Sequence, residues 1–447
     1  MPAHRSTSRS RIVHLITAAV VAVALSGLGA GTAGAAPPTQ DGPTAAEFAS
    51  TWLAAQLDAQ IPMQNFGGPD WGVTLDAALG MVATGVGGAQ VDEVWSALAA
   101  QRDTALASEG VDNPGRLARA ILLAEVLGED PRAVGSGPGA DLVARLAATM
   151  RTEGPDTGLF GSANPTYDGA YRQGYALAAL VAAGVDPDQR SVDWLLGQQC
   201  DAGADAGAWM QHRTDLSAPC AVDAVMFVGP DTNATSAAIT GLAAVEAGAD
   251  AIEGALDWLD RVQRSDGGWE QVAGYGTDPN STALVLQGLL AVGAADAPRF
   301  ADRGASPLGF LLSFQLGCAA PVADRGAFTF PGSNDAPNGF ATAQAVPAAA
   351  GVPVLFEPAD ETDVLPAPDC SPATTTTTPT TVPATPTDPT TVPPATVPTE
   401  ALGATQGPPA RELALTGPTS GVLSGLGAAL LVAGLALLAG SRRRDAA

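Results

Sequence analysis

The sequence predicts an all-α protein made of repeated helix pairs, and residues 255–293 show the repeating unit most clearly. Apolar side chains recur at helical spacing up to Gln263, and two adjacent glycines then allow the chain to turn. A second, almost wholly apolar helix is predicted from residue 282 to 292. A helix this apolar has to be buried on most sides, so the pair requires further copies packed beside it.

The same pattern recurs along most of the chain. The starts of successive pairs are about 45 to 65 residues apart, which is the size of helix-pair repeats. Six pairs are predicted, which makes twelve helices: 46–57 with 71–86, 91–106 with 117–127, 142–150 with 170–185, 191–199 with 235–248, 255–263 with 282–292, and 308–315 with 339–350.

The connections inside several pairs share one spacing of glutamine, glycine and an aromatic residue. Gln263, Gly267 and Trp269 define the spacing. Residues 199–209 repeat it with an insertion, and residues 150–160 and 315–328 keep it with another aromatic residue in place of tryptophan. The residues assigned to this pattern are Gln199, Trp209, Gln263, Gly267, Trp269 and Gln315.

This spacing resembles the QW-type motif, Q-x-x-x-G-x-W, of squalene-hopene cyclases and protein prenyltransferase β-subunits. The resemblance covers about residues 44–357. It implies an α6/α6 toroid, in which outer helices alternate with inner helices around a central cavity. It also implies a structural role for the Gln and Trp side chains, which would tie the end of an outer helix to the start of the next inner helix.

The first residues of the chain are predicted to be a secretory signal peptide, residues 1–35. Three arginines precede an apolar run from residue 12 to 25, and the small residues up to Ala35 fit a cleavage site. The alternative is a retained membrane anchor, for which the apolar run is short.

The C-terminal end resembles the cell-wall sorting signal of Gram-positive surface proteins. An apolar segment at 421–440 is long enough to cross a bilayer, and the arginine-rich tail at 441–447 marks the cytoplasmic side. The LAxTG form is similar to motifs read by actinobacterial class E sortases. The resemblance implies a membrane-held precursor that a sortase cuts after Thr416, which is then joined to peptidoglycan; the alternative is a retained single-span anchor. The motif residues are Leu413, Ala414, Leu415, Thr416 and Gly417.

Residues 358–412 are predicted to be a linker, first acidic and then rich in Thr and Pro, which favours an extended spacer. The chain has a formal net charge of −25. Phosphate backbones would be repelled by so acidic a protein, so nucleic acid is excluded as a partner. Together these features predict a protein displayed outside the cell on the wall.

Four cysteines lie on the predicted extracellular side, where disulfides persist. Pairing of neighbours is favoured among the three connectivities, because it would pin the loop of the fourth pair and clasp the segment that leaves the last pair. The favoured bonds are Cys200 with Cys220 and Cys318 with Cys370.

The catalytic motifs of the resembled enzymes are absent from the sequence. No D-x-D-D acid motif occurs, and the nearest string, residues 186–189, reads as a turn. His212 is the single histidine after the signal peptide, and it is either a zinc ligand with Cys200 and Cys220 or a loop histidine beside a disulfide. No cofactor and no metal site are therefore predicted.

The resemblance would gather the starts of the inner helices at one mouth of the ring. An apolar cavity under a rim of polar and aromatic side chains suits a ligand with a polar head and an apolar body. The candidate residues of this mouth are Asp76, Tyr167, Asp168, Tyr171, Trp209, Asp223, Trp269 and Tyr275.

The sequence is compatible with three functions. The first is a non-catalytic module that binds a lipid or a protein. The second is an extracellular enzyme acting on a lipid or isoprenoid. The third is a corrinoid-binding protein similar to intrinsic factor, although the Thr/Pro-rich linker stands where those proteins have a further domain.

Overall fold

The computed structural model describes residues 41–161, 168–223, 227–301, 305–362 and 364–370. These residues contain thirteen α-helices and two short hairpins. The helices are α1 Gly42–Ala59, α2 Trp71–Thr84, α3 Gly88–Ala105, α4 Pro114–Leu127, α5 Leu142–Ala148, α6 Ala170–Ala182, α7 Gln189–Gly197, α8 Thr232–Ala244, α9 Ala249–Val262, α10 Pro279–Ala291, α11 Pro298–Ala301, α12 Pro307–Leu312 and α13 Gly339–Ala350. The hairpins pair β1 Gln64–Asn65 with β2 Gly68–Pro69, and β3 Ala107–Ser108 with β4 Val111–Asp112.

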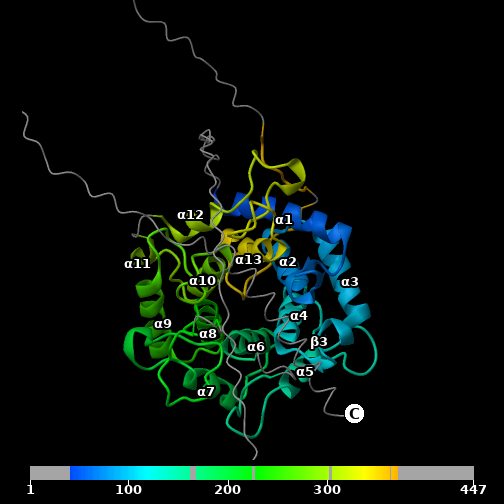
Figure 1. The fold of residues 1–447 in the computed structure, drawn as a ribbon. Coiled ribbons are helices and arrows are strands. Elements are labelled where there is room, and N and C mark those ends of the chain that lie inside the picture. The colour runs from blue at the N-terminus through cyan, green and yellow to red at the C-terminus, as the bar shows by residue number, and fades with distance from the viewer. Residues whose placement is uncertain (1–40, 162–167, 224–226, 302–304, 363, 371–447) are drawn as a thin grey trace, which may run out of the picture. The chain divides into compact units, whose positions relative to one another are not determined.

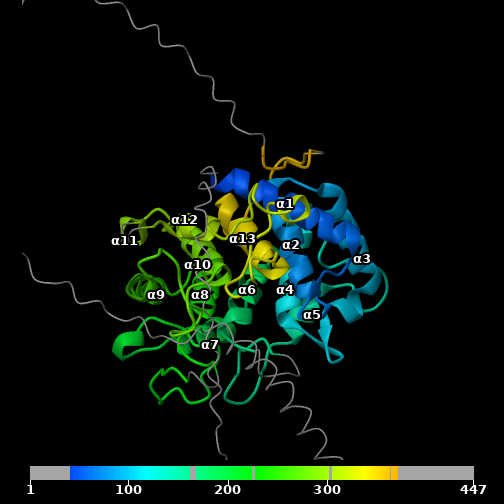
Figure 2. The same cartoon turned by 45° about the horizontal axis from the view of Figure 1, so that its top comes forward.

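The helices form two concentric rings, and Figures 1 and 2 show the outer helices arranged around the inner ones. Helices α2, α4, α6, α8, α10 and α13 make the inner ring, each packed on the next, and α13 packs on α2 to close it. Helices α1, α3, α5, α7, α9 and α12 lie outside, each before its inner partner in the chain. The predicted toroid of six pairs is confirmed for the described residues. Helix α11 was not predicted, and α9 begins six residues earlier than expected.

The inner helices are apolar because they touch neighbours on almost every side. In α10, eleven consecutive residues from Pro279 to Leu289 are buried. Asp278 caps this helix by accepting a hydrogen bond from the Ser281 amide (2.8 Å), and Pro279 fits the first turn. Asp70, Asn113, Asp231 and Asn338 cap α2, α4, α8 and α13 in the same way.

Glycines let two inner helices approach closely. A Cβ on Gly174 in α6 would lie 1.9 Å from the Ala237 carbonyl oxygen in α8, and a Cβ on Gly241 would lie 2.6 Å from Gly174. Neither position can hold a larger side chain without moving a helix backbone.

Glutamine side chains join the later pairs to one another. Each side chain donates one hydrogen bond to a glycine carbonyl in its own connection and a second to a carbonyl of the next outer segment. The sequence led us to expect a bond to the next inner helix, but the glutamine instead reaches the next helix pair. The side-chain amide nitrogen has two N–H donors, which allows both bonds. The glutamines and next-pair carbonyls are Gln199 with Ala251, Gln263 with Phe300, and Gln315 with Ala45, at 2.7, 3.1 and 2.7 Å.

The tryptophans of the same motif hold the two helices of one pair together. The Trp269 indole N–H donates to the Leu259 carbonyl of α9 (2.9 Å), and its backbone N–H donates to the Thr282 hydroxyl of α10 (3.2 Å). Trp209 makes the equivalent bonds in the fourth pair, to α7 and α8. In the third pair Met150 stands at the glutamine position, and Gln173 from α6 supplies the link to α7 instead.

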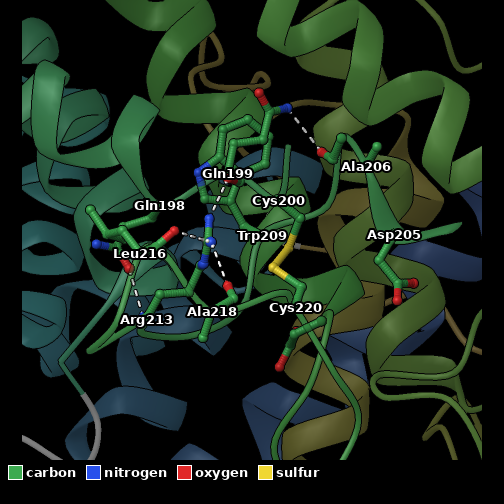
Figure 3. Close-up of a disulfide and its surroundings, with 12 residues drawn as sticks. Gln198, Gln199, Cys200, Asp205, Ala206, Trp209, Arg213, Leu216, Ala218 and Cys220 are labelled. Atoms are coloured by element: carbon green, nitrogen blue, oxygen red, sulfur yellow. Dashed lines mark hydrogen bonds between the residues drawn. A yellow bond between two sulfur atoms is a disulfide. The ribbon is translucent and has the colours of Figure 1, made fainter. Parts of the chain in front are cut away.

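Both predicted disulfides are confirmed. Cys200–Cys220 closes the loop of the fourth pair, where the Arg213 guanidinium donates to the Gln199, Leu216 and Ala218 carbonyls (Figure 3). Cys318–Cys370 joins the connection before α13 to the segment that follows α13.

Several predictions fall outside the described residues. They are the signal peptide, the Thr/Pro-rich part of the linker, the sorting motif, the apolar segment at 421–440 and the basic tail. In the part of the chain that the structure describes, no helix is both long and apolar enough to cross a membrane.

Candidate functional site

The centre of the inner ring contains a largely buried ion pair beside two aromatic rings that contact each other. Asp76 of α2 forms a short ion pair with Arg119 of α4, whose guanidinium also donates to the Tyr171 hydroxyl (3.0 Å). The same guanidinium lies 4.7 Å from the ring centre of Tyr175, and the two tyrosine rings are 5.2 Å apart. We call these four residues the lumen cluster.

The environment of the lumen cluster fixes its charges. Burial raises the pKa of the Asp76 carboxyl, and the Arg119 guanidinium opposes that rise. Burial acts to lower the pKa of Arg119, but Asp76 and the tyrosines raise it above its usual range. Burial also raises the pKa values of Tyr171 and Tyr175, so both phenols are neutral at pH 7. Asp76 and Arg119 are therefore each other's partners, and neither tyrosine is poised as a base.

The cavity beside the lumen cluster is small. Its volume is about 30 Å³, enough for about one water molecule. Asp76, Tyr175, Gln287 and Gln344 line it from the inner helices, and residues from the segment after α13 cover it: Pro353, Val354 and Phe356. The ring is thus largely filled by its own side chains.

Amide side chains complete the polar part of the lumen. Asn280 Nδ2 donates to Gln344 Oε1 (2.9 Å), and Gln287 Nε2 donates to the Gln344 carbonyl (3.3 Å). Within the described residues the buried Asn280 Oδ1 accepts no hydrogen bond. These amides hold α10 against α13, and they offer a buried water one acceptor.

Asp231 is a second buried carboxyl. It caps α8 by accepting from the Ala234 amide (2.9 Å), and it also accepts from Gln271 Nε2 (2.9 Å). Burial raises the pKa of Asp231 to about 6, although these hydrogen bonds oppose the rise. Asp278, the cap of α10, also has a pKa raised by burial.

The residues predicted to form a mouth do not come together as one site. Asp76 and Tyr171 lie in the lumen cluster, whereas Trp209 and Trp269 are completely buried between helices. Asp223 and Tyr275 are exposed on connections, and Tyr167 lies outside the described residues. The remaining candidate is Asp168.

Asp168 is a structural anion. It is 1% exposed and forms ion pairs with Arg151 (3.1 Å) and Arg172 (3.0 Å). Two guanidinium groups hold the carboxylate in place, so it is a poor candidate for proton transfer.

His212 does not share a metal site with the nearby cysteines, because Cys200 and Cys220 are bonded to each other. Its Nε2 lies 2.9 Å from Asp156 Oδ1, and its ring stacks on Trp194. Burial acts to raise the pKa of Asp156, but its interactions with His212, Trp194 and Arg151 together lower it. Among the described residues no group of three His, Cys, Asp or Glu side chains is placed to hold a metal ion.

The two faces of the ring differ. We call the side where the inner helices begin the N-face and the side where they end the C-face. Every exposed aromatic side chain of the described residues lies on a connection that leads into an inner helix, on the N-face. These are Phe66 (95% exposed), Phe227 (41%), Tyr275 (43%) and Phe330 (40%).

Three of these aromatic residues are not among the site residues predicted from the sequence, although the sequence around one of them carries a signal. Phe66 is followed by two glycines and a proline, the composition of a tight turn, where a large apolar side chain has nothing to pack against. Phe227 and Tyr275 come from different connections and contact each other edge to face at 4.3 Å, which no local pattern indicates.

No protein-family model matches this sequence, and no curated protein matches it. Solved structures are similar at low identity. A protein from Actinoplanes is 16% identical over 69% of this chain and 98% of its own, with a TM-score of 0.47. Protein geranylgeranyltransferase-I from Candida albicans is 10% identical over 67% and 90% (0.46), and unsaturated glucuronyl hydrolase from Bacillus sp. GL1 is 14% identical over 69% and 96% (0.44).

Proposed function

We propose that the ring is a non-catalytic interaction module that binds a protein partner through its N-face. The observation that carries this proposal is the location of the exposed aromatics. Aromatic side chains are enriched among the residues that carry most of the binding energy in protein interfaces. Here all that are exposed in the described residues lie on one face.

The lumen supports the same proposal. A ligand with an apolar body requires a cavity of several hundred Å³. The cavity beside the lumen cluster measures about 30 Å³ and is covered by the protein's own chain. The ionisable groups around it are already paired, so the surface rather than the interior is the better candidate for binding.

The Phe66 hairpin provides the sharpest test. We would replace Phe66 with the photoreactive analogue p-benzoylphenylalanine in the full chain produced by its own cells, and replace Glu109 in the same way as the control. Glu109 occupies the matching turn position of the second hairpin. Irradiation is expected to give a covalent adduct with one protein at position 66 and none at 109. Purified chain with Glu109→Ala should compete for the adduct, whereas Phe66→Ala should not. Adducts at neither position would contradict binding through the N-face. Equal adducts at both positions would show that the partner contacts this face without selecting the exposed aromatic.

The proposal includes display of the ring on the cell wall, for which the sorting motif and the order of the segments around it are the support. Replacing Thr416 with Ala should move the protein from the wall fraction to the membrane fraction. A variant that stays attached to the wall after detergent extraction would show that the motif is not used.

A second candidate function is acid–base catalysis by Asp231, which the raised pKa favours, because a group with a pKa near 6 can gain and lose a proton near neutral pH. Incubation with squalene or prenyl diphosphates tests it. If one of these compounds is turned over and Asp231→Asn abolishes the turnover, catalysis replaces binding as the proposed function.

A further inference from the structure

The segment after α13 forms a strap that begins on the C-face. Its residues 351–370, apart from 363, run from the end of α13 past α1 to Cys370, whose disulfide partner Cys318 lies on the connection into α13, on the N-face. The Ala359 amide donates to the Val82 carbonyl (3.2 Å), and the Thr362 amide donates to the Gly85 carbonyl (2.8 Å). The end of the strap lies beside α1 in both views, drawn in orange in Figures 1 and 2.

One glycine of the ring is fitted to the strap. Gly85 ends α2 with φ +68°, and a Cβ there would lie 2.0 Å from the Asp360 carbonyl oxygen. Gly128 ends α4 with nearly the same backbone, φ +70°, and has open space where its Cβ would be. The two positions therefore differ in strap contact and not in backbone conformation.

The strap also forms part of the wall of the lumen cavity. Pro353, Val354 and Phe356 line the cavity beside Asp76, and Val354 is buried. Removing the strap would open this cavity and expose Asp76 further. Few hydrogen bonds hold the strap beyond residue 356, and those at its far end lie near the surface.

We propose that the Cys318–Cys370 disulfide is a clamp that keeps the strap attached to the ring when the chain is pulled from beyond residue 370. Force on that part of the chain first reaches Cys370. The disulfide then transmits the force to Cys318 in the body of the ring, so the strap residues before Cys370 do not carry it. Without the bond, the same force acts directly on the Pro366 contact with Thr51 and peels the strap residue by residue.

The clamp acts without force as well. The bond joins two residues 52 apart, so it limits the conformations that a detached strap could adopt. Reduction therefore favours the detached state, and the attachment of the strap becomes sensitive to the redox state outside the cell.

Hydrogen exchange of the full chain tests the proposal. The double variant Cys318→Ser/Cys370→Ser is expected to exchange the Ala359 and Thr362 amides at least about tenfold faster than the parent, because the loop constraint is lost. The matched control, Cys200→Ser/Cys220→Ser, removes the other disulfide and should leave strap exchange unchanged. Equal strap protection in both double variants, or equal loss in both, would overturn the proposal.

A second pair of variants keeps both disulfides. Gly85→Ala should raise strap exchange, and Gly128→Ala should not, although both place alanine in a left-handed conformation. This pair remains informative if the cysteine variants fold poorly. If the two variants behave alike, the strap is not seated on Gly85 as described.

Single-molecule pulling on the two ends of the full chain measures the clamp directly. The parent should show no extension of the strap before the ring unfolds. The Cys318→Ser/Cys370→Ser variant should show an early step of up to about 65 Å, the contour length of residues 352–370. An early step of that size in the oxidised parent would show that the bond does not protect the strap. The experiment does not depend on the N-face binding a partner, so either proposal can fail without the other.

Discussion

The N-face and the C-face are made by opposite ends of the same six inner helices, and they differ in what they expose. On the N-face, connections carry helix caps, hairpins and four exposed aromatics. On the C-face, α2, α4 and α13 end at left-handed glycines, and the strap crosses α2 and covers the lumen. One face is thus partly covered by the chain's own strap and the other exposes aromatic side chains, although both are made by the same six helices.

The largest expected effect separates buried from exposed aromatics on the N-face. Trp269 and Tyr275 belong to the same connection, but Trp269 is 0% exposed and Tyr275 is 43% exposed. Trp269→Ala should lower the free energy of unfolding by about 3–5 kcal/mol, whereas Tyr275→Ala should change it by less than about 1 kcal/mol. Denaturant titration checks both. A large loss for Tyr275→Ala would mean that the exposed aromatics serve the fold.

A pH-dependent effect distinguishes two helix caps. The pKa of Asp231 is raised from 3.8 to about 6 by burial, so its carboxylate destabilises the fold above pH 6, and this penalty disappears as the pH falls below 3.8. Asp231→Asn keeps a capping side chain and should raise the unfolding free energy by up to about 3 kcal/mol at pH 7, with no gain near pH 3.

The control for this prediction is Asp41, the exposed cap of α1, whose pKa is lowered by hydrogen bonds from Thr44. Its carboxylate stabilises the fold at neutral pH, and that stabilisation is lost as the pH falls. Asp41→Asn should therefore lower the free energy of unfolding at pH 7, the opposite of the change expected for Asp231→Asn. Unfolding curves measured from pH 3 to 7 decide the matter, and a gain for Asp231→Asn that does not depend on pH would contradict the burial argument.

The smallest expected effect on stability belongs to the residue expected to matter most for binding. Phe66 is 95% exposed at the tip of its hairpin, with φ 48°, and Glu109 holds the same turn position in the second hairpin, with φ 54°. Phe66→Ala should change the unfolding free energy by no more than about 0.5 kcal/mol. A loss above about 2 kcal/mol would show that Phe66 packs against the ring.

Much of the fold could be predicted because the relevant signals are local. The six helix pairs follow from apolar periodicity, and both disulfides follow from cysteines that bracket one loop and one connection. The lumen cluster could not be predicted. Asp76 and Arg119 are 43 residues apart in sequence, and only the closed ring brings their side chains together.

The strap was also missed, for a physical reason. The acidic, proline-rich stretch from 358 reads as a linker because it has no periodicity, but its backbone pairs with the end of α2 as far as Thr362. Hydrogen bonding by an irregular segment leaves no pattern in the sequence. The ordered contacts therefore continue to Cys370, beyond the predicted end of the domain at 357.

The hydrogen bond from Gln315 to Ala45 joins residues 270 positions apart, and it has a consequence for how the protein is made. In an open array of repeats, the first units can fold while later ones are still being synthesised. Here the first pair lacks one of its two neighbours until α13 has been translated. The ring therefore cannot close on the ribosome before the last pair emerges.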